Sequence, residues 1–229
     1  MLSMAFNSLY NIVDSYFVAK LSEDAMTALS LVYPAQNLLT AVAVGFGVGV
    51  NAMISFYLGA QNQGKADKTA SEMCIRDRLH GVLLMVLFLC GMNLFLGMFT
   101  KSDTVRALGM EYSNVVFLFS VIVTGGITLE KIFQAVGRMR ATMVSMIAGF
   151  VTNIVLDPLL IFGIGPFPRM EIAGAALATG IGQVITLLVY LIYYVADPLP
   201  VKLHKKYLRP EGDICSKTYG IGIPATLNM

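Results

Sequence analysis

The sequence is dominated by apolar runs long enough to cross a membrane. Six of these runs reach the roughly 20 residues that span about 30 Å of hydrocarbon. Because backbone groups inside a bilayer have no water to bond, only helices and closed barrels can cross it. The runs are continuous rather than alternating, which favours helices. Charged residues make up only 13% of the chain, about half the share typical of soluble domains. The sequence therefore predicts an all-α fold, a polytopic transmembrane helix bundle.

The apolar runs also predict how the chain is divided. The expected helices cover residues 1–20, 25–59, 79–99, 111–136, 142–162 and 172–195, with polar loops at 61–68 and 100–106. We expect a six-helix transmembrane lobe at 1–196, a cytoplasmic linker at 197–218 and the truncated start of a seventh helix at 219–229. The first run lacks the basic start and cleavage site of a signal peptide, so it is not expected to be cleaved. Met1 resembles a truncation point or an internal start, and the last apolar run stops abruptly at Met229, so we expect a fragment of a longer protein.

Basic residues predict the orientation in the membrane. Loops on one side hold Lys65, Lys68, Arg138, Arg140, Lys202, Lys205, Lys206 and Arg209, whereas the opposite side holds Lys20, Lys101, Arg106 and Arg169. Cytoplasmic loops carry the excess of Lys and Arg, so the N-terminus is expected in the cytoplasm. These loops are short and the net charge is only +2, so no nucleic-acid partner is expected. Three widely spaced cysteines suit neither a disulfide framework nor a zinc site.

One carboxylate lies in the middle of the first apolar run. On a helix, Ser3, Asn7, Asn11 and Asp14 follow one another at spacings of four, four and three, so they share one face. An ionised carboxylate at membrane depth costs about 2.5–3.5 kcal/mol on insertion scales. Such a group is retained where it faces a cavity and acts on ions or protons. The alternative is an Asp14 that snorkels to the headgroups.

The fifth run carries a second polar constellation. Asn153 and Asp157 are four residues apart, and Pro158 leaves the carbonyl of Ile154 without its usual helical donor. Hard oxygen ligands within one turn suit a small cation. The alternative is a kinked helix whose Asp pairs with a basic residue, but no Lys or Arg lies near the middle of any expected span.

Further polar residues are candidates for the lining of a cavity. Pro34 is expected to kink the second helix, and Gln36 and Asn37 follow it directly. On the sixth helix, Thr179 and Gln183 are four apart. The Thr179 hydroxyl either turns into the bundle or bonds back to its own helix.

Three further positions, Gly45, Gly47 and Gly49, are expected to allow close helix packing. Glu130 and Lys131, near the end of the fourth helix, are expected to snorkel to the headgroups.

Residues 72–78 differ in character from their surroundings. The heptamer Glu-Met-Cys-Ile-Arg-Asp-Arg places four charges at the expected start of the third helix. It resembles the translation of a transposon end sequence used in preparing sequencing libraries. A natural juxtamembrane charge cluster is the alternative. We expect the heptamer to be a sequencing artefact and assign it no function.

Several motifs occur in an order typical of one transporter family. The segments are NIVDSYFV, QN, GVGVNA and LGA, then NIVLDPLLIFG, then AGAALATGIGQ. With them the chain resembles the multidrug and toxic compound extrusion (MATE) family from end to end, apart from the heptamer. The resemblance implies the first of two six-helix lobes, so the partner missing here is the C-terminal lobe of the same full-length protein.

The resemblance also implies a function and a site. Members of the family export cationic, often aromatic, compounds across the lipid bilayer by antiport with Na⁺ or H⁺ and need no other cofactor. The matching cation or proton site in the first lobe consists of Asp14, Asn153, Asp157 and Thr179. Asn11, Gln36, Asn37 and Gln183 are the candidate residues of the substrate cavity.

These inferences suggest a carboxylate switch. If Asp14 and Asp157 face each other in a dry pocket, both cannot ionise cheaply without a positive charge between them. Loading would then favour one geometry of the first helix and release a bound drug. A lipid or glycan flippase of the same superfamily is the nearest alternative, and a structural subunit is another. HExxH and DDxxD motifs are absent, so an intramembrane enzyme is not expected.

Overall fold

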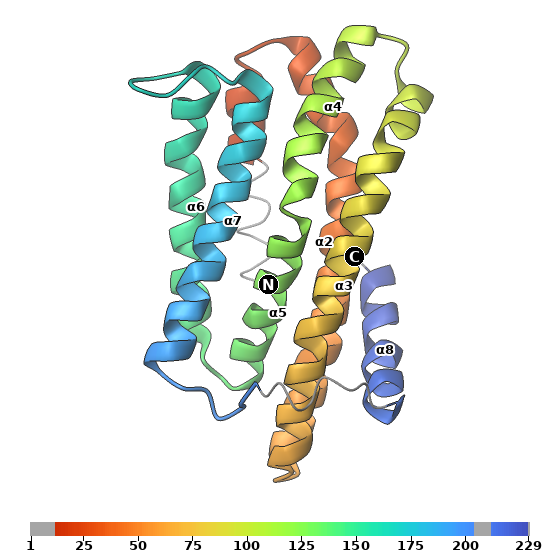
Figure 1. The fold of residues 1–229 in the computed structure, drawn as a ribbon, viewed down its shortest axis with the longest axis vertical. Coiled ribbons are helices and arrows are strands. Elements are labelled where there is room, and N and C mark those ends of the chain that lie inside the picture. Colours follow the sequence, from red (N-terminus) through yellow and green to blue (C-terminus); the bar gives the residue numbers. More distant parts are fainter. Residues whose placement is uncertain (1–11, 204–211, 229) are drawn as a thin grey trace. The chain divides into compact units, whose positions relative to one another are not determined.

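Every regular element in the described residues, 12–203 and 212–228, is a helix (Figure 1). The computed structural model has a short helical stretch at residues 12–18 before the longer helices. The longer helices are α2 (Glu23–Gly59), α3 (Gln63–Phe99), α4 (Asp103–Leu118), α5 (Ser120–Ala135), α6 (Met139–Phe162), α7 (Glu171–Ala196) and α8 (Gly212–Leu227). The prediction of an all-α helix bundle is confirmed.

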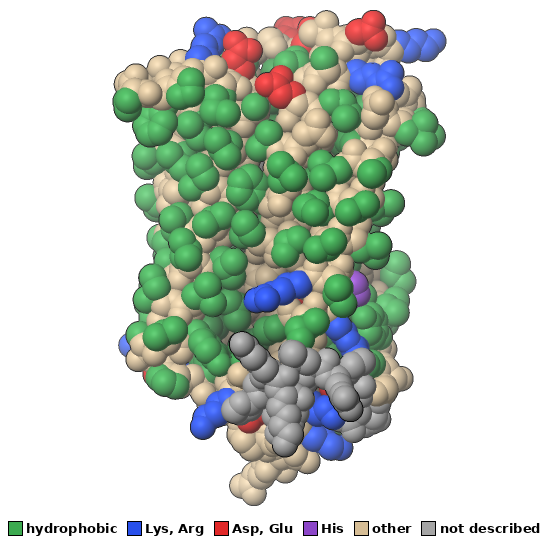
Figure 2. Space-filling model, in the orientation of Figure 1, with side chains coloured by type: hydrophobic (Ala, Val, Ile, Leu, Met, Phe, Trp, Pro, Cys, Tyr) green, Lys and Arg blue, Asp and Glu red, His purple; other side chains and the backbone are tan. Residues whose placement is uncertain are grey.

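Four helices are individually long and apolar enough to cross a membrane. They are α2, α3, α6 and α7, and the consecutive helices α4 and α5, bent by 47°, together make a fifth candidate span among the described residues. Large apolar side chains such as Leu83 and Leu94 are exposed, and Figure 2 shows hydrophobic side chains over much of the visible face. Lipid is the solvent that such a surface requires. The chain is therefore a multi-pass membrane protein.

The helices contribute to two compact units with separate cores. The first comprises Met1–Asn37, Leu84–Ser120 and Met146–Thr186, and the second comprises Leu38–Leu83, Val121–Ser145 and Leu187–Met229. In the first unit α6 and α7 lie side by side (Figure 1), and a Cβ added to Gly174 would lie 2.7 Å from the carbonyl carbon of Leu160. Small residues at such crossings let backbones approach closely. The rings of Phe88 and Phe117 stack in the same unit at 4.6 Å.

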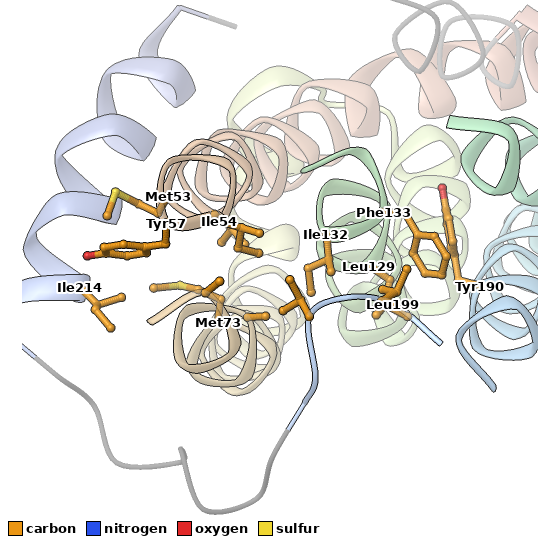
Figure 3. Close-up of a cluster of buried hydrophobic side chains, with 14 of the residues drawn as sticks. Met53, Ile54, Tyr57, Met73, Leu129, Ile132, Phe133, Tyr190, Leu199 and Ile214 are labelled. Atoms are coloured by element: carbon orange, nitrogen blue, oxygen red, sulfur yellow. The ribbon is translucent and has the colours of Figure 1, made fainter. Parts of the chain in front are cut away.

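The core of the second unit gathers apolar side chains from six helices, including Ala141 of α6. Figure 3 shows Met53, Ile54 and Tyr57 of α2, Met73 of α3, Leu129, Ile132 and Phe133 of α5, Tyr190 of α7 and Ile214 of α8. Leu199 and Val201, which follow α7, also belong to this core. The Asp67 carboxylate accepts a hydrogen bond from the Lys202 backbone N–H at 2.9 Å. The first residues of the expected linker are thus packed onto this unit.

Two of the predicted glycine contacts join α2 to α8 in the second unit. A Cβ on Gly49 would lie 2.5 Å from the Thr218 carbonyl oxygen, and a Cβ on Gly45 would lie 2.7 Å from the Thr226 backbone nitrogen. Thr218, Gly222 and Thr226 are spaced by four residues, so small groups line the facing stripe of α8. At the third position, Gly47, the nearby group is the Lys131 stem of α5.

The predicted loop at 61–68 is wrong, because α3 already begins at Gln63. The Asn62 side chain accepts a hydrogen bond from the Lys65 backbone N–H at 3.2 Å, which caps the helix. From Lys65 to His80 there is no glycine or proline to stop it. A helix of 37 residues is about 55 Å long and exceeds the ~30 Å hydrocarbon core, so polarity at its start does not mark a loop. The heptamer 72–78 consequently lies inside α3, where Glu72 and Asp77 are buried.

Three more features of the helices differ from the predictions. Ser102 caps α4, which begins at Asp103, eight residues before the expected helix at 111. The helix expected at 111–136 is interrupted at Phe119, between α4 and α5. The helix expected from residue 219 begins earlier, at Gly212. Both α4 and α8 start in residues that the hydropathy pattern had assigned to polar connections.

Candidate functional site

Asp14 is buried and bonded within the first unit. Only 4% of its surface is exposed, although it lies on the short helical stretch 12–18. Thr179 Oγ1 donates a hydrogen bond of 2.8 Å to Asp14 Oδ2, and Asn153 Nδ2 donates one of 3.3 Å to Asp14 Oδ1. Asp14 does not snorkel, and the Thr179 hydroxyl turns into the bundle. The two residues are 165 positions apart in the chain.

Asn153 joins the polar groups of α6 and α7. Its Nδ2 lies 3.3 Å from Asp157 Oδ1 and 3.4 Å from Thr179 Oγ1, in addition to its bond to Asp14. Asn153 and Asp157 are four residues apart on one face of α6, and both are fully buried. An amide NH₂ has two hydrogens, so it cannot serve three acceptors fully at once. The long distances fit a shared and incomplete set of bonds.

Two buried oxygens at this site have no hydrogen-bond partner among the residues that the structure describes. They are Asn153 Oδ1 and Asp157 Oδ2. The Asn153 amide nitrogen lies 3.3 Å from Asp14 Oδ1 and 3.3 Å from Asp157 Oδ1, so the two carboxyl groups flank the same amide. Two buried carboxylates cannot both remain charged at low cost without a compensating cation. The arrangement can therefore hold either one proton or one small cation among hard oxygen ligands.

The ligand types at this candidate site suit a hard cation. Two carboxylates, a carboxamide and a hydroxyl offer only oxygen atoms. No group of three or more His, Cys, Asp or Glu side chains suited to a metal ion occurs within residues 12–203 and 212–228. This donor set fits Na⁺ better than a transition metal.

Tyr112 of α4 belongs to the same surroundings and was not predicted. It is 1% exposed, and its oxygen accepts a hydrogen bond of 3.2 Å from Gln36 Nε2. The charge of Asp14 acts on the Tyr112 hydroxyl, and the charge of Asp157 acts on it more weakly. The helical spacing of the buried residues Val105, Gly109 and Tyr112 gave a signal, because a hydroxyl on the buried face of a helix needs a polar partner.

The other predicted cavity residues are placed differently. Asn37 is exposed and Gln183 is half-buried. Within the described part of the chain, neither forms a hydrogen bond with Asp14, Asn153, Asp157 or Thr179. Asn11, with Ser3 and Asn7, lies outside the described residues. Gln36 is half-buried and reaches the site through Tyr112.

The second unit holds a separate buried ion pair that corrects another expectation. Lys131 Nζ lies 3.0 Å from Glu130 Oε1, and each residue is only 7% exposed. Gln134 donates to the same carboxylate oxygen at 2.7 Å and accepts from the ammonium at 3.2 Å. Asn51 of α2 donates to the Lys131 carbonyl. Glu130 and Lys131 therefore do not snorkel, because the pair neutralises its own charge inside the unit.

A helix bundle of membrane spans with a buried carboxylate pair is an architecture typical of secondary transporters. The family model described as MatE matches residues 1–159, and the chain belongs to this family. The multidrug export protein MepA of Staphylococcus aureus is 30% identical over 228 residues, which are 99% of this chain and 50% of that protein. MepA of Staphylococcus haemolyticus is 28% identical over the same length. The chain spans about half the length of these relatives.

Solved structures agree with the family assignment. A crystal structure of a MATE protein in the bent conformation matches with a TM-score of 0.90 at 28% identity, over 98% of this chain and 49% of that one. An inward-facing multidrug resistance MATE family transporter of the MOP superfamily matches at 0.89 and 29% identity, over 96% of this chain and 49% of that chain. A MOP superfamily transporter from Pyrococcus furiosus, whose binding pocket is described as reversed in polarity, matches at 0.89 and 26% identity, over 98% and 49%. The relatives are transporters rather than enzymes.

Proposed function

We propose that the full-length protein is a secondary active antiporter that exports cationic or aromatic drugs in exchange for Na⁺ or H⁺. Asp14, Asn153, Asp157 and Thr179 are its coupling site. Membership of the MatE family and the multidrug export proteins among its relatives support the transport class. The observation that carries the coupling site is the pair of unpartnered oxygens, Asn153 Oδ1 and Asp157 Oδ2, buried beside the Asp14 carboxylate.

The mechanism follows from the cost of two buried negative charges. With one proton or one Na⁺ between them, Asp14 and Asp157 carry a single negative charge shared across the pair. Loss of that positive charge leaves two carboxylates in a dry pocket, and burying their uncompensated negative charge is costly. A cationic drug that binds where it relieves this cost would compete with the ion. Coupling requires only that the ion binds the two conformations with different affinities.

The proposal extends to the arrangement in the cell. The N-terminus lies in the cytoplasm, as the distribution of Lys and Arg indicates. The segment after α7 continues toward the C-terminal lobe, which completes the cavity for the drug. The drugs, the lipid bilayer and that lobe are the partners, and the coupling ion is the only cofactor.

The test uses the full-length transporter in a drug-sensitive bacterial host. Asp14→Asn removes the negative charge while keeping the shape of the side chain, so ethidium efflux and drug resistance should fall to the level of the empty vector with expression unchanged. Asp24→Asn, at an exposed position in the first turn of α2, is the matched control and should retain efflux. Resistance that persists in the Asp14→Asn variant would overturn the coupling role. If the unmutated protein does not export ethidium but transports a lipid-linked pyrophosphate, it is instead a flippase.

Efflux in buffers with and without Na⁺, at two pH values, identifies the ion. Dependence on Na⁺ at fixed pH identifies Na⁺, whereas dependence on pH in Na⁺-free buffer identifies H⁺.

A further inference from the structure

Two glycines mark where α7 approaches its neighbours most closely in the first unit. At Gly174 an added Cβ would lie 2.7 Å from the carbonyl carbon of Leu160 in α6, so this contact joins backbone to backbone. At Gly180 an added Cβ would meet the ring of Phe119 instead. The two glycines are six residues apart, so at about 3.6 residues per turn they face directions ~120° apart. Together these contacts limit both the rotation and the tilt of α7.

The contact at Gly180 leaves no room for a larger residue. The Cγ of Phe119, which is the ring carbon nearest its backbone, would lie 2.7 Å from the added Cβ, and Cδ2 and Cε2 would be nearer still. Because Cγ moves little when the ring turns, the ring cannot swing clear of a methyl group cheaply. The Phe119 ring thus occupies the space that a side chain at position 180 would need.

Phe119 lies at the break between α4 and α5. Its backbone has φ −84° and ψ 1°, and its N–H bonds to the Val116 carbonyl at 3.2 Å. Ser120, the first residue of α5, is 1% exposed and donates to the Phe117 carbonyl at 2.6 Å. These bonds hold the break in a defined conformation, so the break itself sets the direction of the Phe119 ring.

The residue before Gly180 is Thr179, which belongs to the candidate site. Its Oγ1 donates the 2.8 Å hydrogen bond to Asp14 Oδ2. A displacement of about 0.5 Å would take this bond out of the usual O–H···O range of about 2.5–3.0 Å. Any shift of α7 at position 180 moves position 179 with it, because both residues belong to one helical turn. The position of the Phe119 ring therefore affects how well Thr179 reaches Asp14.

We propose that Phe119 is a positioning residue for the coupling site and acts through Thr179. This inference rests on the proposed function. The ring, packed against Gly180, holds α7 at the rotation and depth that direct the Thr179 hydroxyl onto Asp14. Because a hydrogen bond to a carboxylate is a strong one, its placement affects how tightly the site holds its ion. Phe119 thus affects ion binding from outside the four-residue site.

The test measures the ion concentration, as Na⁺ or as H⁺, that half-saturates ethidium transport by the full-length transporter in proteoliposomes. Phe119→Ala removes the ring, and Gly180→Ala adds the methyl group that the ring excludes. Each should shift this concentration in the same direction as Thr179→Val, by about fivefold, the effect of losing one ordinary hydrogen bond. Phe119→Leu combined with Gly180→Ala should return it close to the unmutated value, because the smaller side chain makes room for the methyl group.

A second arm of the experiment asks whether the effect passes through Thr179. In the Thr179→Val background the hydroxyl is gone, so Phe119→Ala should cause no further shift. A merely structural role of the ring would change the amount of folded protein or the maximal rate without this dependence on Thr179. Two controls should keep the unmutated ion dependence. They are Leu118→Ala, at a neighbouring position that is 59% exposed, and Gly91→Ala, where no described atom lies within 4 Å of an added methyl group.

Three outcomes overturn the inference. They are an unaltered ion dependence in Phe119→Ala or Gly180→Ala, a failure of the Leu–Ala combination to restore it, and an equal effect of Phe119→Ala in the Thr179→Val background. If Phe119→Ala does not fold, Phe119→Leu alone takes its place and should give a smaller shift in the same direction.

The unmutated protein and Thr179→Val separate this inference from the proposed function. If the unmutated protein shows no ion-dependent export, the proposed function itself has failed. If Thr179→Val alters a clear ion dependence and the changes at Phe119 and Gly180 do not, only the role of Phe119 has failed.

Discussion

Single residues of the site differ in how far the sequence reveals them. Asn153 and Asp157 are one helical turn apart, so their spacing alone predicts a shared face, and the structure places them on one. The approach of Asp14 to Thr179 joins positions 165 apart and follows from no local period; the family resemblance suggested it. Tyr112 was missed because one hydroxyl in an apolar helix gives no pattern of its own.

Thr179 provides a prediction at this scale. Its hydroxyl makes the shortest recorded bond to Asp14, at 2.8 Å, so Thr179→Val replaces a donor with a methyl group of similar size. We expect the half-saturating concentration of the coupling ion to change by about tenfold to a hundredfold, since a hydrogen bond to a charged group is lost. Ion-dependent efflux in proteoliposomes measures the change.

Thr179→Ser is the matched control, since it keeps the hydroxyl and should behave as the unmutated protein does. Equal ion dependence in the Val and Ser variants would show that the hydroxyl does not act on the site.

Whole elements were predicted well where apolar length decides them and poorly where helices leave the membrane. α6 and α7 lie within three residues of their expected bounds. α3 begins sixteen residues before the expected start, since helix propensity and an Asn62 cap operate in polar sequence as well. The bend between α4 and α5 falls at Phe119, inside the single helix expected at 111–136. The hydropathy of the sequence predicts which part of a helix lies in the membrane, but it does not predict the residue at which the helix begins or ends.

The contact between α2 and α8 gives a prediction about stability. A methyl group at Gly49 would lie 2.5 Å from the Thr218 carbonyl oxygen, and backbone cannot move away as cheaply as a side chain. Gly49→Ala should therefore destabilise the protein by about 1–3 kcal/mol, the usual cost of overpacking. The midpoint of thermal unfolding in detergent reports the loss.

Gly91→Ala, in α3, is the control for that experiment. Nothing lies within 4 Å of an added methyl group there, and alanine is the better helix former, so its midpoint should stay the same or rise. A Gly49→Ala protein as stable as the Gly91→Ala protein would refute the close contact.

The heptamer in α3 calls for a direct check of the sequence. It buries Glu72 and Asp77 in the second unit, where Asp77 contacts the Thr128 hydroxyl. We expect amplification and sequencing of the genomic locus across Glu72–Arg78 to return different, mainly apolar residues. An unchanged heptamer would make these charges a natural feature of α3.

At the scale of the whole molecule, the membrane class was predictable and the packing was not. Composition and run length determine that the chain crosses a bilayer several times. Four of the five divisions between the two compact units fall within α2, α3, α6 and α7, where no turn or polar segment of the sequence marks them, and the fifth follows Ser120, the first residue of α5. The four residues of the proposed coupling site all lie in the first unit. The ion chemistry can therefore be examined through this unit within the full-length protein.

The most direct test of the account is the number of positive charges displaced when a drug binds. Ethidium is added to the purified full-length transporter, and protons released into weak buffer and radioactive Na⁺ released from the protein are both counted. The account predicts about one positive charge displaced per transporter, and none in the Asp14→Asn, Asp157→Asn double variant, because the two carboxyl groups share a single charge. Ethidium binding with no ion displaced, or the same displacement in the double variant, would contradict it.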